Sequence, residues 1–153
     1  MSRTGSGASG SHEDAPPCRT KLHHTYSPPV IPGLQICSDC RDQLENDLVE
    51  LPGWYDSSAD YLDFRSSRGT DRRRADALVS VRSEILSTLG SWCDMVAEER
   101  GVLPPNELDI RQMATFLIIH FTWLTAHHAV PDLVDKLAGL TEAVRTVVRP
   151  DAT

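Results

Sequence analysis

The sequence has no apolar run of the roughly 18 residues that a membrane-spanning helix needs. Its Gly/Ser-rich beginning also lacks the apolar segment of a secretory signal peptide. Three motifs with defined chemistry are missing as well: the phosphate-binding P-loop, the nucleophile elbow G-x-S-x-G and the zinc-protease motif H-E-x-x-H. We therefore expect a cytoplasmic protein that is not an enzyme and does not act at a membrane.

Positive charge is scarce. The chain has 15 lysines and arginines against 22 aspartates and glutamates, which is a formal net charge of −7. This balance disfavours non-specific binding to a phosphate backbone. What the chain does have is typical of one compact domain: it contains 153 residues, of which 40% are hydrophobic and 24% are charged.

Glycine and proline divide the chain into three parts. Residues 1–17 are rich in glycine and serine and end in Ala-Pro-Pro, so we predict a disordered tail. Residues 18–40 contain three prolines and three of the four cysteines, which predicts an irregular loop around a zinc knuckle. Residues 41–149 repeat apolar residues at helical spacing, which predicts a helical bundle domain.

The fold class predicted for this domain is all-α, because no segment has the pattern of a strand. Pro52 and Gly53 should separate the first helix from a shorter second one. The helices are expected over residues 38–51, 54–64, 78–100, 107–126 and 131–149. The last three should form an antiparallel bundle of long helices, with the two shorter ones packed alongside.

The apolar segment 116–121 should make the fourth of these helices the central, most buried one. Apolar residues of the three long helices should meet in one core. The residues expected there are Leu89, Trp92, Leu117, Leu124, Leu137 and Val144.

The sharpest motif is Cys18-x4-His23-x13-Cys37-x2-Cys40. A tetrahedral zinc site needs four soft or borderline ligands, and a Cys-x2-Cys knuckle at the start of a helix supplies two of them. The helix start also favours the thiolate form of both cysteines. Cys18 and either His23 or His24 would complete the set. We predict a structural zinc site and leave two alternatives open: reduced thiols without metal, and a redox pair or iron–sulfur site.

Three more histidines, His120, His127 and His128, lie on or just after the fourth predicted helix. His120 and His127 are two turns apart, about 10 Å along the axis, which is too far for both to bind one metal. We interpret His120 as a core histidine and the other two as helix-end residues that complement the helix dipole. A catalytic role for His120 with a carboxylate such as Glu98 is the less favoured alternative.

A short basic run interrupts the acidic surface, and we interpret it as a solvated polar linker. The segment before it, 39–63, carries eight acidic residues and one arginine, so the run can pair internally. The alternative is contact with nucleic acid or an acidic partner. The residues concerned are Arg65, Arg68, Arg72, Arg73 and Arg74.

Five stretches of the chain carry a family resemblance: 37–41 (Cys-Ser-Asp-Cys-Arg), 44–55, 81–92, 96–101 and 116–127. Over roughly residues 37–147 the chain resembles hypothetical proteins of actinobacteria and their phages, some of which are labelled OvmZ. The resemblance implies no settled biochemical role. Longer relatives look like this domain followed by a zinc ribbon and a helix-turn-helix-like tail, which this sequence lacks, so we expect no direct DNA binding.

Many of these relatives begin with a Cys-x2-Cys where this chain has the lone Cys18. Together, these observations predict a non-enzymatic accessory or regulatory protein. It would be a small helical interaction module with a structural zinc site and a protein partner. The alternative is a nucleic-acid-associated regulator that uses the basic run 65–74 and the zinc loop.

Overall fold

The structure is a computed structural model that describes residues 15–68 and 72–148. The predicted disordered tail lies outside these residues except for 15–17, where the prediction is wrong. Pro17 pairs with Pro29 in an isolated β-bridge, and the Val30 N–H donates to the Pro16 carbonyl at 2.9 Å. The ordered N-terminal loop therefore begins before Cys18.

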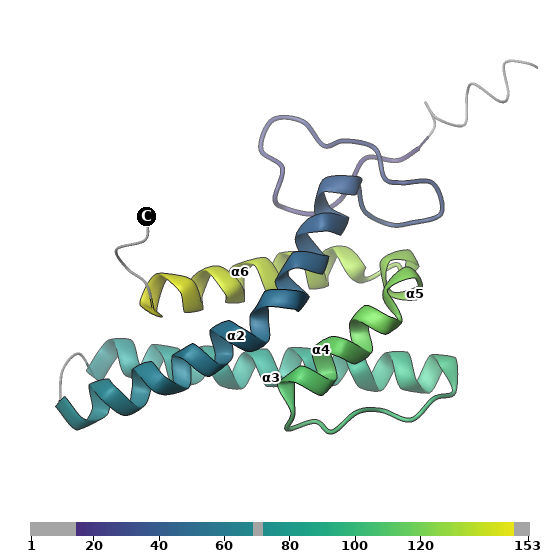
Figure 1. Cartoon of the computed structure of the whole chain (residues 1–153). Coiled ribbons are helices and arrows are strands. Elements are labelled where there is room, and N and C mark those ends of the chain that lie inside the picture. Colours follow the sequence, from purple (N-terminus) through teal and green to yellow (C-terminus); the bar gives the residue numbers. More distant parts are fainter. Residues whose placement is uncertain (1–14, 69–71, 149–153) are drawn as a thin grey trace, which may run out of the picture.

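The all-α prediction is confirmed for the described residues, which form three long helices and two short ones (Figure 1). The helices are α2 (Ser38–Arg68), α3 (Arg72–Arg100), α4 (Ile110–Ile119), α5 (Phe121–Ala126) and α6 (Val130–Val148). The three long helices are not the three that were predicted. Helix α2 is long where two shorter helices were expected, and the predicted fourth helix is divided into α4 and α5.

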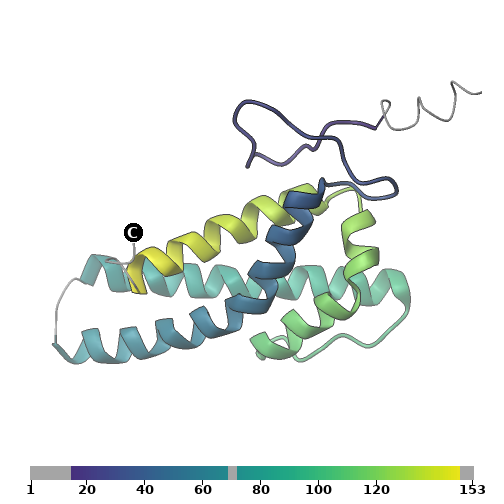
Figure 2. The same ribbon diagram turned by 45° about the horizontal axis from the view of Figure 1, so that its top comes forward.

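Helix α2 runs through Pro52, where the sequence pattern predicted an interruption. A proline inside a helix costs about 3 kcal/mol, because it lacks the N–H and clashes with the carbonyl four residues earlier. Leu44, Leu48 and Leu51 are completely buried on this helix, and each contributes about 1.5–3 kcal/mol. Their burial offsets the cost of the proline, and the helix bends in its middle instead of ending (Figure 2).

The second half of α2 packs on α3. The Arg82 guanidinium lies 3.8 Å from the centre of the Tyr55 ring and also contacts Ser58, which is buried. Helix α3 begins at Arg72, earlier than the first predicted apolar position, and Gly101 ends it with a positive φ of 67°. All five arginines of the basic run are therefore helical and not part of a linker: Arg65 and Arg68 belong to α2, and 72–74 form the first turn of α3.

The predicted helix 107–126 is two helices. Asp109 caps α4, since its carboxylate accepts hydrogen bonds from the Arg111 and Gln112 amides at 3.1 and 3.2 Å. His120, with φ −97° and ψ 25°, separates α4 from α5, although its N–H still donates to the Phe116 carbonyl. The apolar residues keep their helical spacing across this break, so the sequence pattern did not predict the turn.

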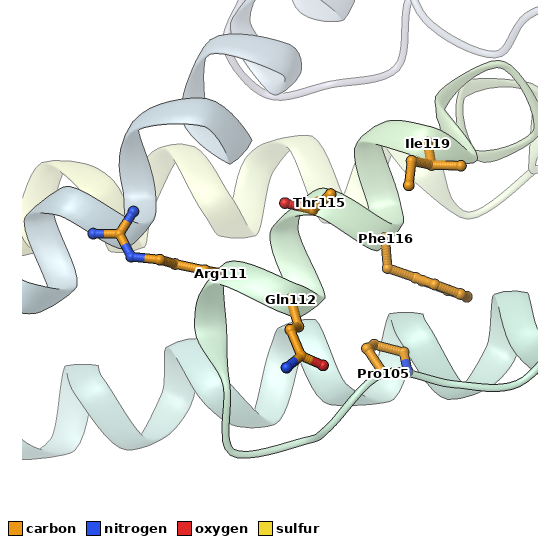
Figure 3. Close-up of a pocket in the computed structure, with 6 residues that line it drawn as sticks. All are labelled: Pro105, Arg111, Gln112, Thr115, Phe116 and Ile119. Carbon is orange, nitrogen blue, oxygen red and sulfur yellow. The ribbon is translucent and has the colours of Figure 1, made fainter.

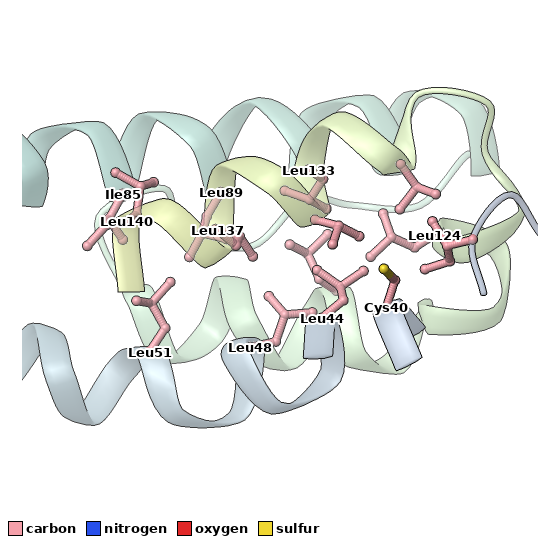
Figure 4. Packing of buried hydrophobic residues seen from close by; sticks show 14 of the residues in the cluster. Cys40, Leu44, Leu48, Leu51, Ile85, Leu89, Leu124, Leu133, Leu137 and Leu140 are labelled. Carbon is pink, nitrogen blue, oxygen red and sulfur yellow. The ribbon is translucent and has the colours of Figure 1, made fainter. Parts of the chain in front are cut away.

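The core lies between α2, α6, α3 and α4, and α2 packs against the other three. Leu89, Leu117, Leu124, Leu137 and Val144 are buried in one cluster, as predicted, whereas Trp92 is half-buried against it. Helix α4 is not the most buried element, because only one of its faces is covered and Ile119 is 72% exposed. Cys40 joins the same cluster beside Leu44 and Leu124 (Figure 4).

Candidate metal centre

The N-terminal loop folds back on itself and brings Cys18 to the start of α2. The Cys18 N–H donates to the Pro28 carbonyl at 2.8 Å, and the Ile31 N–H donates to the Ile36 carbonyl at 2.9 Å. Gly33 turns the chain with a positive φ of 84°, a conformation that favours glycine. These backbone contacts place Cys18 next to the Cys-x2-Cys segment, although 18 residues separate it from Cys37.

Four hydrogen bonds, donated by three residues, attach this loop to the bundle. The Gln35 N–H donates to the Thr125 carbonyl at 2.9 Å, at the end of α5. The Lys21 N–H donates to both carboxylate oxygens of Asp135 on α6, at 2.9 and 3.1 Å. The Arg19 guanidinium donates to the His128 carbonyl at 2.9 Å. The loop therefore bridges the start of α2 and the α5–α6 end of the bundle.

Four of the five predicted ligands converge. One ligand atom from each of Cys18, His23, Cys37 and Cys40 lies within 4.8 Å of the other three. The three cysteines are buried, with exposures of 2–3%, and none forms a disulfide. His24, the alternative ligand, is exposed and lies outside this group. These four side chains lie close enough together to bind one metal ion.

Three of the distances between these ligand atoms match the edges of a small tetrahedron. The Cys18 and Cys40 sulfurs are 3.8 Å apart, and His23 Nε2 lies 3.5 Å from the Cys37 sulfur and 3.4 Å from the Cys40 sulfur. Zinc–sulfur bonds of about 2.3 Å and zinc–nitrogen bonds of about 2.0 Å at tetrahedral angles give edges of about 3.8 and 3.5 Å. These three separations therefore fit the edges of a tetrahedral zinc site, and the remaining ones are within 4.8 Å.

Hydrogen bonds and burial shift the pKa values of the Cys18 and Cys40 thiols in opposite directions. Burial opposes ionisation of Cys18, but the backbone amides of Thr20 and Cys37 and the Thr20 hydroxyl outweigh it and lower the pKa to about 6. The Cys37 N–H lies 3.4 Å from the Cys18 sulfur. Burial raises the pKa of Cys40 to about 12, and the neighbouring Cys37 and Cys18 add to this. Without a cation, ionisation of Cys18 is therefore favoured over ionisation of Cys40.

Thr20 is a member of this site that the sequence reasoning missed. Its hydroxyl lies 3.0 Å from the Cys40 sulfur and 3.6 Å from the Cys18 sulfur, and the residue is 5% exposed. A hydroxyl in this position can hydrogen-bond a metal-bound thiolate, as outer-sphere groups do in metal sites. Its position two residues after Cys18 is the feature of the sequence that could have indicated this role.

The basic run does not join the metal cluster. Arg72, Arg73 and Arg74 are exposed on the first turn of α3, next to the C-terminal end of α2. The cysteines lie at the opposite end of α2, whose 31 residues span about 45 Å of helix (Figure 1). Only the backbone of 65–68 is described, and 69–71 lie outside the described residues. The metal cluster and these arginines therefore lie at opposite ends of α2.

The histidine interpretation needs a correction, because His127 rather than His120 is packed into the molecule. The His127 side chain is 10% exposed, and its Nδ1 accepts a hydrogen bond from the Ala129 N–H at 3.1 Å. His120 is only half-buried, and its Nδ1 lies 3.3 Å from the Arg100 guanidinium. Burial and the Arg100 charge lower the pKa of His120. Each of the two histidines therefore already has a local partner.

Helix α4 borders an apolar groove of about 370 Å³. Phe116 and Ile119 line it together with Pro105 of the preceding loop, as Figure 3 shows. Arg111 extends from its edge toward α2, where it pairs with Asp56 at 2.6 Å. In the loop before α4, Leu103 is 89% exposed. Apolar side chains therefore remain uncovered on this side.

None of the helices in the described part of the chain combines the length and the apolar content that crossing a membrane requires. No protein-family model matches the chain, and neither a curated protein nor a solved structure is measurably similar to it. The resemblance to the actinobacterial proteins therefore stays a prediction.

Proposed function

We propose that this chain is a non-enzymatic accessory or regulatory protein, in which a structural zinc ion holds the N-terminal loop on a helical interaction module. The convergence of Cys18, His23, Cys37 and Cys40 carries this proposal. Three thiolates and an imidazole are a ligand set that zinc prefers, whereas calcium and magnesium prefer oxygen ligands. Four protein ligands also complete a tetrahedron, so no position is left for a substrate or a reactive water.

The interaction role rests on the exposed apolar side chains around α4. Ile119 lines the groove with Phe116 and Pro105 and is 72% exposed, and Leu108, in the loop before α4, is 84% exposed. Exposed apolar patches rimmed by polar residues are common at protein–protein contacts. The net charge of −7 and the distance between the arginines and the loop favour a protein partner over nucleic acid.

Metal analysis of protein purified under reducing conditions tests the zinc site. We expect about one zinc per chain in the wild type and in Cys93→Ala, since Cys93 is buried near the Met113 carbonyl and outside the cluster. Cys40→Ser should lose the metal. Wild-type protein that is metal-free and keeps the helicity and melting temperature of a zinc-supplemented sample would contradict the proposal.

A photo-crosslinking residue at Ile119 tests the interaction role in the native host. Position 79 on α3 is a matched control, because Val79 is also exposed, at 54%. We expect a discrete protein adduct from position 119 that position 79 does not give. Identical adduct patterns from the two positions would contradict the use of this groove.

A further inference from the structure

A second pocket, of about 400 Å³, lies where the metal loop meets the end of the bundle. One of its residues comes from the loop and one from the end of α3. The others belong to α5 and to the turn that follows α5. The lining residues are Gln35, Glu99, Trp123, Ala126, His127 and His128. Its walls therefore pair aromatic rings with a carboxylate.

The aromatic wall is held in place by its own contacts. The His127 ring stacks on His128 at 4.5 Å between centroids and lies 5.4 Å from Trp123, while Trp92 meets it edge-on at 5.5 Å. Because Nδ1 of His127 accepts the Ala129 N–H, the ring proton of the neutral form is on Nε2. The rings are thus ordered before any ligand binds.

Glu99 supplies a negative charge with spare acceptor capacity. Its side chain is 49% exposed, and Oε2 lies 3.9 Å from His127 Nε2, which is longer than a hydrogen bond. Among the described residues this is the carboxylate's one recorded polar contact. A carboxylate beside the faces of Trp and His rings attracts a cation, through charge and through the ring quadrupoles.

Among the described residues, Arg19 and Arg100 each contact a residue in or beside this pocket. Arg19 donates to the backbone oxygen of His128 at 2.9 Å, and Arg100 contacts His120 Nδ1 at 3.3 Å. Neither lines the pocket, so neither neutralises Glu99 there. The Arg19 contact shows that a guanidinium already binds at the rim.

We propose that this pocket binds an arginine side chain of the protein partner. A planar guanidinium can stack on Trp123 while it donates two hydrogen bonds to Glu99, which a lysine ammonium cannot match. Contacts of Phe116 with His120 at 4.6 Å and of His120 with Arg100 at 3.3 Å connect the α4 groove to the end of α3, which carries Glu99. One partner segment can therefore use both the groove and the pocket. The identity of the ligand as a protein side chain rests on the proposed interaction role.

The test is an NMR titration of the metal-loaded protein with N-acetyl-arginine amide, which carries one guanidinium between two peptide bonds. We expect saturable shifts at the Trp123 indole and the His127 ring, with a Kd on the order of 1–10 mM, and no shift at Trp54 of α2. N-acetyl-citrulline amide has nearly the same shape without the charge and should bind at least about tenfold more weakly. Glu99→Gln should weaken binding about tenfold, whereas the exposed neighbour change Glu98→Gln should not.

Three results would overturn the inference: equal binding of the arginine and citrulline probes, wild-type binding by Glu99→Gln, or no saturable shift. Tighter binding of agmatine, which lacks the peptide bonds, would point to a free small molecule and would overturn the assignment to a partner side chain. Metal content is measured on the same samples. Protein that retains its metal but does not bind the probe would overturn this inference and leave the zinc site intact.

Discussion

At the scale of single residues, Thr20 is the outer-sphere group whose role can be measured. Thr20→Val keeps the shape of the side chain but removes the hydroxyl that lies 3.0 Å from the Cys40 sulfur. Loss of an outer-sphere hydrogen bond usually lowers metal affinity about 10–100-fold. We expect a loss in this range in a chelator competition assay, with the exposed Thr25→Val as a matched control. Unchanged affinity in Thr20→Val would show that the hydroxyl serves only packing.

Asp47 is a buried carboxylate that should oppose folding at neutral pH. It is 2% exposed, Oδ1 accepts a hydrogen bond from the Gln43 amide, and Oδ2 has no partner. Burial raises its pKa, although Gln43 and Arg145 act in the other direction. Because the folded-state pKa lies above the unfolded value, this group favours folding at low pH, and that contribution is lost as the pH rises through the folded pKa.

Asp47→Asn removes this titration. We expect its melting temperature, relative to wild type, to be higher at pH 7 than at pH 4, as measured by circular dichroism. Asp42→Asn, the same substitution at an exposed position on the same helix, is the control for the effect of burial. A relative melting temperature of Asp47→Asn that does not change with pH would refute the account of this carboxylate.

At the scale of the elements, α4 has two faces with opposite roles. Leu117 is completely buried, whereas Ile119, two residues later, is 72% exposed. Leu117→Ala should cost about 2–5 kcal/mol of unfolding free energy, from lost burial and the cavity left behind. Ile119→Ala should change stability by less than about 0.5 kcal/mol. Urea unfolding of the two variants measures the difference, and equal losses would mean that this side of α4 is covered in solution.

Helix α2 shows where local sequence rules gave way to packing. Pro52 predicted two helices, and the structure has one bent helix, since three fully buried leucines outweigh a cost of about 3 kcal/mol. The prediction for residues 107–126 was wrong in the opposite way, since one helix was predicted and two are present. Its apolar spacing is continuous, yet the chain turns at His120. Periodicity reports which residues face a core, but not whether the axis stays straight.

At the scale of the whole molecule, the metal and the bundle should be coupled. Cys18, Cys37 and Cys40 belong to the hydrophobic core cluster, and the loop is attached to α5 and α6. Chelation should therefore lower the melting temperature and speed amide exchange at Lys21 and Gln35, while the central turns of α3 stay protected. Hydrogen exchange with and without chelator measures this. Unchanged exchange in the loop after metal loss would argue against the structural role.

The charge of the whole chain predicts whether it binds nucleic acid. The arginines of 72–74 are few, their reach at physiological salt is about 8 Å, and the chain carries a net charge of −7. We expect no DNA binding near physiological salt in fluorescence anisotropy. Salt-sensitive binding that disappears when Arg72, Arg73 and Arg74 are all replaced by alanine would restore the nucleic-acid alternative.

The sequence by itself determined the all-α class, most of the core residues and three of the four candidate metal ligands. These depend on spacing along the chain: apolar residues recur at helical steps, and Cys-x2-Cys places two sulfurs in one turn. Only the tertiary structure selected His23 over His24, because the fold of the Pro-rich loop decides which imidazole faces the sulfurs. It alone brought Thr20 to Cys40 and Glu99 to His127. Such contacts join segments that are distant in sequence, so their geometry follows from how the helices and the loop pack and not from any local pattern.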